Sequence, residues 1–133
     1  MKNIFTKLAL NFFLAGLFSS SVFAAGNEVD ISGHWTGVVE LANGQELPFG
    51  ITLNQNGTEV SGFMDGIGGP DVTIMDPRLE DNILYYSSLR PINGEDVPFE
   101  YIAVVSGDYM NITIIRVGAT GPNSVLSTMT QRQ

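Results

Sequence analysis

Gly33-His34-Trp35-Thr36-Gly37 begins the first of eight short segments in which successive side chains alternate between two faces. Such alternation is typical of a half-buried β-strand. The segments are separated by turn residues, of which Asn43-Gly44 is a strong hairpin signal. Eight strands are predicted, at residues 34–41, 47–53, 60–65, 72–75, 83–89, 97–105, 109–117 and 125–131.

Short sequential connections between these strands predict one all-β domain, a single eight-stranded antiparallel up-and-down β-barrel. Closure is expected because it removes the exposed edges of a meander. An open sandwich of seven or eight strands would have similar turn spacing and is the alternative fold. We expect a loop at one barrel mouth at the glycine-rich residues 66–70, and a longer loop at residues 90–96.

The first 24 residues resemble a secretory signal peptide. Lys2 and Lys7 form a positive region, an apolar run covers residues 8–18, and Val22-Phe23-Ala24 offers a cleavage site. Cleavage after Ala24 leaves residues 25–133, which make up 109 of the 133 residues and are enough for one domain. We therefore expect a periplasmic or secreted protein.

The expected mature chain is strongly acidic. It has four arginines against 14 acidic residues, a net charge of about −10. This charge argues against nucleic acid or anionic lipid as a partner and favours neutral or cationic ligands. Stable membrane insertion is not expected either, since Thr36, Glu40 and Glu100 fall on the predicted outer face, where lipid would require apolar residues.

Several chemistries are excluded or unsupported by the composition. The chain has no cysteine, and both lysines lie in the predicted signal peptide, so thiolate and Schiff-base chemistry are excluded from the mature chain. His34 is the single histidine, and its place beside Trp35 predicts an exposed side chain. No metal site or cofactor is predicted, because Asp65, Asp71 and Asp76 around the glycine-rich loop lack the spacing of a calcium-binding loop.

Gly33-x-Trp35 on the first strand, the eight meander strands and Arg132 at the end of the last strand together resemble the lipocalin and calycin pattern. The chain departs from many lipocalins in lacking the N-terminal 3₁₀ turn, the C-terminal helix and the cysteines. It looks closer to the short, exported, lipocalin-like domains of bacteria than to these larger lipocalins. The resemblance implies that Trp35 closes one end of the barrel and that Arg132 packs across it in a cation–π contact.

The inward register that starts at Trp35 predicts a largely aromatic lumen. Tyr85 and Tyr101 would supply hydroxyl groups that orient a ligand. The same pattern fits a fully packed core, so the alternation alone leaves both interpretations open. The residues predicted to bind a ligand are Trp35, Phe49, Ile51, Met64, Tyr85, Phe99, Tyr101 and Ile112.

We expect the barrel to bind a small hydrophobic molecule in its lumen. Two alternatives remain: an isomerase- or cyclase-type enzyme that uses the same apolar cavity, with catalytic residues unassigned, and a protein-interaction or inhibitor domain with a filled barrel, whose loops do the binding. A homodimer is also predicted. If Ala103 and Val105 face inward, Ile102, Val104 and Ile115 form an apolar patch on the outside.

Overall fold

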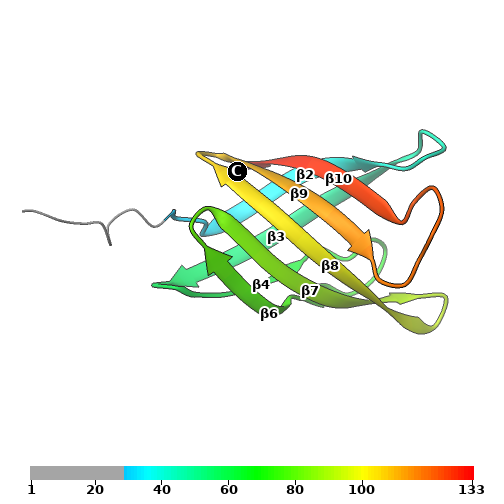
Figure 1. The fold of residues 1–133 in the computed structure, drawn as a ribbon, viewed down its shortest axis with the longest axis horizontal. Coiled ribbons are helices and arrows are strands. Elements are labelled where there is room, and N and C mark those ends of the chain that lie inside the picture. Colours follow the sequence, from blue (N-terminus) through cyan, green and yellow to red (C-terminus); the bar gives the residue numbers. More distant parts are fainter. Residues whose placement is uncertain (1–28) are drawn as a thin grey trace, which may run out of the picture.

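The computed structural model describes residues 29–133, so the predicted signal peptide lies outside the described residues. The described chain forms one curled antiparallel sheet (Figure 1). Its strands are β2 (Gly33–Glu40), β3 (Glu46–Asn56), β4 (Glu59–Met64), β5 (Val72–Thr73), β6 (Met75–Glu80), β7 (Ile83–Ile92), β8 (Glu95–Ser106), β9 (Tyr109–Arg116) and β10 (Val125–Arg132). Residues 29–133 contain no helix that is long and apolar enough to cross a membrane.

The strands follow one another around the sheet as a meander, in the order β5-β4-β3-β2-β10-β9-β8-β7-β6. The first and last of them, β2 and β10, pair with each other at Trp35↔Arg132 and Thr36↔Gln131. All the other bonded neighbours in this sheet are strands that follow each other directly in the chain. The prediction of an antiparallel, all-β fold with up-and-down connections is therefore confirmed.

The predicted count of eight strands and the predicted closure are both wrong, since the described sheet has nine strands and its hydrogen-bonded ladder does not close. The segment expected as one strand at 72–75 divides at Ile74. Its amide donates to the carbonyl oxygen of Gly62 on β4 (3.1 Å), whereas the next carbonyl, that of Met75, accepts from Ser87 Oγ on β7 (3.3 Å). The edge strands of the sheet, β5 and β6, are therefore connected directly through Ile74.

The division at Ile74 has a local cause in the residues that follow it. Asp76 has a φ of 50°, and Pro77 has no amide hydrogen with which to continue a ladder. The pairing of β6 with β7 shifts register between Met75 and Arg78, which marks an irregularity of the bulge type. One extended segment therefore cannot bond to β4 and β7 along its whole length.

The prediction of a long loop at residues 90–96 is also wrong. Strand β7 continues to Ile92 and β8 begins at Glu95, so only Asn93 and Gly94 form the turn. Their φ angles of 53° and 83° are those of a tight hairpin turn in which both central residues are left-handed. This turn extends the inner face of β7 by several residues toward one end of the sheet.

The end of the sheet near Trp35 is filled by side chains. Trp35, Ile51, Met64, Leu84 and Ile112 are fully buried there. Residues 30–32 fold across this end, and the Trp35 Nε1–H donates to the carbonyl oxygen of Ile31 (3.0 Å). Such a packed end fixes the relative positions of strands that are far apart in sequence.

Arg132 covers this packed end from outside. Its guanidinium carbon lies 4.4 Å from the centroid of the Trp35 ring, which confirms the predicted cation–π contact. The guanidinium also donates hydrogen bonds to four oxygen atoms that surround it. They are the carbonyl oxygens of Asp30, Ser32 and Gly107 and the carboxylate of Asp108.

The outer face of β8 and β9 carries the predicted apolar patch. Ala103 and Val105 are buried on the inner face, so Ile102 and Val104 point outward as expected. Val104 is 41% exposed, while Ile102 and Ile115 are half-buried. Self-association through this patch stays a prediction.

Candidate functional site

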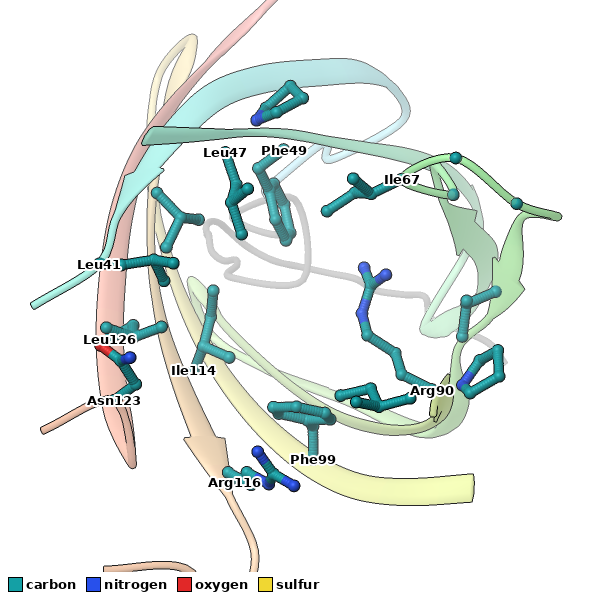
Figure 2. A pocket seen from close by; sticks show the side chains of 18 of the residues that line it. Leu41, Leu47, Phe49, Ile67, Arg90, Phe99, Ile114, Arg116, Asn123 and Leu126 are labelled. Atoms are coloured by element: carbon teal, nitrogen blue, oxygen red, sulfur yellow. The ribbon is translucent and has the colours of Figure 1, made fainter. Parts of the chain in front are cut away.

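A cavity of about 540 Å³ opens at the end of the sheet away from Trp35 (Figure 2). Its rim is formed by residues 66–70, as predicted, by the turns that follow β2 and β9, and by the end of β7. These two turns are tied together, because Asn123 Oδ1 accepts a hydrogen bond from the amide of Ala42 (2.8 Å). The opening thus has a rim that is partly held by hydrogen bonds.

Aliphatic and aromatic side chains form most of the cavity wall. They come from both halves of the sheet, so that Phe49 on β3 faces Phe99 on β8 across the opening in Figure 2. The apolar side chains of the wall are those of Val39, Leu41, Leu47, Phe49, Ile67, Val72, Ile92, Phe99, Ile114 and Leu126. A wall of this kind is typical of small-molecule sites.

Three aromatic rings lead from the cavity toward the packed end. The rings of Phe99 and Tyr101 on β8 have centroids 6.3 Å apart, and the Tyr101 ring stacks on that of Tyr86 on β7 at 4.4 Å with an interplanar angle of 7°. The Tyr101 hydroxyl shares a hydrogen bond of 2.8 Å with Ser88 Oγ. This buried pair gives the inner end of the cavity a satisfied polar floor.

Tyr86 lies behind this floor and remains neutral. Burial raises the pKa of its hydroxyl well above the usual value near 10, and the neighbouring Tyr101 raises it further, while Arg90 partly opposes both effects. Its hydroxyl contacts Met64 Sδ at 3.9 Å. Tyr86 therefore serves as a rigid support for Tyr101 rather than as a proton donor near neutral pH.

Arg90 is the charged group that projects into the cavity. It is half-buried on β7, on the same face as Ser88, and Figure 2 shows its guanidinium reaching toward the middle of the opening. Its one hydrogen-bond partner among the described residues is Met64 Sδ at 3.7 Å, a weak acceptor. Most of the donor capacity of this guanidinium is thus free to face the cavity.

The four arginines fall into two groups, two with a carboxylate partner and two without one among the described residues. Arg78 pairs with Glu80 and Arg132 with Asp108, whereas within residues 29–133 no carboxylate lies within 4.0 Å of Arg90 or Arg116. Both of these unpaired arginines line the cavity, with Arg116 exposed at its rim. In the described part of the chain, the wall of this cavity therefore holds two arginines and no acidic side chain.

Three of the residues predicted to bind a ligand line the cavity: Phe49, Phe99 and Tyr101. Four others lie on the inner face but in the packed half, and they do not line the cavity. Those four are Trp35, Ile51, Met64 and Ile112, each 0% exposed. The two interpretations of the lumen, a container and a packed core, thus each describe one half of the interior.

The predicted inward position of Tyr85 is wrong, because the inward-facing residues of β7 are shifted by one position from those predicted. Leu84, Tyr86 and Ser88 are the buried residues of this strand, so Tyr85 lies on the opposite face. There its ring lies under the Arg78 guanidinium at 4.4 Å. It borders a second pocket of about 360 Å³, which Ile102 and Ile115 also line.

Sequence reasoning missed Arg90 because it assigned this residue to a loop. The signal that could have found it is Asn93-Gly94, whose pattern favours a two-residue hairpin turn. A two-residue turn extends β7 to Ile92, and alternation from Tyr86 then places Arg90 on the inner face. Leu126 on β10, Leu47 on β3 and Leu41, which directly follows β2, could have been found by the same alternation.

His34 and the loop carboxylates lie outside the cavity. His34 is on the outer face as predicted, with its side chain 43% exposed and its Nε2 3.2 Å from Asp65 Oδ2. Asp71 Oδ1 accepts a hydrogen bond from the Gly66 amide (3.1 Å), which gives this carboxylate a role within the glycine-rich loop. Residues 29–133 contain no cluster of three side chains able to hold a metal ion.

Comparison of the chain with models of protein families, with curated proteins and with solved structures found no match.

Proposed function

We propose that this chain is an exported binding protein that holds one small apolar molecule in the cavity. The observation that carries the proposal is the cavity itself, since about 540 Å³ is a typical size for a small-molecule site. Its wall is mostly apolar and its few polar groups, among them Tyr101 and Arg90, come from neighbouring strands. The opposite end is closed under Arg132, so a ligand would enter and leave at the rim of residues 66–70.

The chemistry of the wall favours binding over an isomerase or cyclase reaction. Within the described chain, the residues that line this cavity include no Asp, Glu or His. The Tyr101 hydroxyl is already engaged with Ser88. General acid–base catalysis needs a group that gains or loses a proton near the working pH, and this wall offers no such group.

The open half of the interior favours a container over a protein-interaction domain with a filled barrel. We further propose that the fold is lipocalin-like. The Arg132–Trp35 contact, the meander order and the pairing of first and last strands support this likeness. The division between β5 and β6 departs from a continuous eight-stranded ladder.

The proposal is tested by filling the cavity. Leu126 on β10 points into the cavity, whereas its neighbour Val125 is 60% exposed on the outer face. Leu126→Trp adds an indole ring to the cavity, and Val125→Trp adds the same ring to the outer surface. Binding of Nile red, a neutral dye whose emission rises in apolar surroundings, is measured for the mature protein and both variants.

We expect a saturable emission increase at one dye per chain for the mature protein and for Val125→Trp, and at least a tenfold weaker affinity for Leu126→Trp. Unfolding curves in urea establish that both variants are folded. A dye affinity that is equal in the two variants, or no saturable binding by the mature protein, would overturn the proposed function.

A further inference from the structure

Among the residues that the structure describes, the cavity combines an apolar wall with one arginine, Arg90, that projects into its interior, while Arg116 lies at the rim. Arg90 extends from β7 toward the middle of the opening, on the side of Phe49 and Ile67, as Figure 2 shows. Half-buried guanidinium groups in folded proteins are normally matched by a carboxylate or by several carbonyl oxygens, because partial loss of water is costly for a charge. Arg132 in this same chain has such a set of oxygen acceptors.

Arg90 lacks such a set. Its hydrogen bond goes to a thioether sulfur, and no carboxylate of the described chain lies within 4.0 Å. The shortage of acceptors does not follow from the composition, since 14 acidic residues are available against four arginines. The strands instead expose the carboxylates and direct this guanidinium inward.

We propose that the ligand of this cavity is an amphipathic monoanion, an apolar organic acid whose carboxylate pairs with Arg90 while its hydrocarbon part contacts Phe49, Ile114 and Leu126. This inference rests on the proposed function, because it names the class of molecule held at that site. The planar guanidinium fork matches a carboxylate with two parallel hydrogen bonds. One inward cation balances one negative charge, which fits a monoanion better than a dianion such as a phosphate monoester.

This inference replaces the expectation that the acidic chain favours neutral or cationic ligands. Net charge acts at long range and is screened within about a Debye length, roughly 8 Å at physiological salt. Among the described residues, Arg90 and Arg116 line the cavity whereas no Asp or Glu does, so a molecule bound there would contact positive but not negative side chains. The acidic outer surface can therefore repel an anionic ligand in a salt-dependent way while the arginines of the cavity attract it.

The test compares decanoate with 1-decanol, which have the same chain length but differ in the charge of the polar end. Each is used below its aggregation concentration to displace Nile red from the mature protein at pH 7.5. Arg90→Met removes the inward charge. Arg78→Met is the matched control, because it removes the same charge from the outer face beside Tyr85. Arg90→Lys keeps the charge but loses the planar fork.

We expect decanoate to displace the dye at a concentration at least tenfold lower than 1-decanol, a preference of the size that a charge-assisted pair confers. The preference should disappear in Arg90→Met, persist in Arg78→Met and be reduced in Arg90→Lys. Binding of the dye by Arg90→Met reports that its cavity is intact.

Two other results are distinguishable from each other. Equal displacement by acid and alcohol, or a preference that survives in Arg90→Met, would overturn the acid ligand while dye binding still supported the apolar site. Failure of the mature protein to bind the dye or either competitor would remove the proposed function, and this inference with it.

Discussion

The Arg132 guanidinium lies against the face of the Trp35 ring, with its central carbon 4.4 Å from the ring centroid, and this contact joins the last strand to the first. The backbones of the same two residues pair in the β2–β10 ladder. One residue thus contributes a strand pairing, a ring contact and side-chain hydrogen bonds at the packed end of the sheet.

Replacing Arg132 by Met should destabilise the protein by about 2–4 kcal/mol, because the cation–π contact and several hydrogen bonds to carbonyl oxygens are lost together. The exposed carboxylate of Asp108 adds little to this sum. The free energy of unfolding is measured by urea denaturation. Arg78→Met, which breaks an exposed pair with Glu80, serves as the control and should change it by less than about 1 kcal/mol. Equal effects of the two variants would contradict the account of the packed end.

Gly37 allows β10 to approach β2 closely. A Cβ atom at this position would lie 2.5 Å from the carbonyl oxygen of Met129 and 2.9 Å from Thr128 Oγ1. We therefore expect Gly37→Ala to force the strands apart and to destabilise the fold by about 1–3 kcal/mol in urea denaturation. Val38→Ala, on the exposed face of the same strand, should stay within about 0.5 kcal/mol of the parent. A neutral Gly37→Ala substitution would show that the strands have room to spare.

Tyr86 should make stability depend on alkaline pH. Its pKa is raised in the folded protein by burial, so the folded state holds the proton more tightly than the unfolded chain. The stabilisation is fully present below about pH 10, where the unfolded tyrosine is also neutral, and is lost as pH rises above that value. The free energy of unfolding should fall between pH 9 and 11 more steeply for the parent than for Tyr86→Phe, by up to about 1.4 kcal/mol per pH unit. Identical slopes would place the Tyr86 hydroxyl in water.

The outward patch of Ile102, Val104 and Ile115 predicts a homodimer. Light scattering at micromolar concentration should give twice the mass of one mature chain, and Val104→Asp, which adds a charge to the 41% exposed position, should give a monomer. A monomeric mass for the parent protein at these concentrations would reject the dimer.

The parts of the fold that follow from local patterns could be predicted from the sequence. Trp35, Phe49, Phe99 and Tyr101 are predicted to face inward, and each does. The Arg132–Trp35 contact is expected from a proposed likeness to lipocalins, and the contact itself is present. The extension of β7 to Ile92 could have been predicted from the turn residues Asn93-Gly94. The nearby Pro91 instead favoured a loop from residue 90 onward. Strand β6 could not be predicted, because its irregular pairing around Asp76 and Pro77 depends on where β4 and β7 lie in three dimensions.

The cavity itself was beyond sequence reasoning for a different physical reason. An alternating pattern shows which side chains point inward, but the space they leave depends on how the two sides of the sheet come together. Trp35 and Met64 fill one half, while Phe49 and Phe99 border an opening in the other. Since all four are large apolar residues of inner faces, nothing in their pattern separates the two roles.

The central claim, that the open half of the sheet carries a small molecule, is tested most directly by native mass spectrometry of mature protein purified gently from its own producing cells. Solvent extraction of the same sample then identifies any small molecule it held. The account predicts one apolar adduct per chain, absent from Leu126→Trp and retained by Val125→Trp. Protein that is free of adducts, and that also binds neither Nile red nor decanoate after purification, would contradict it.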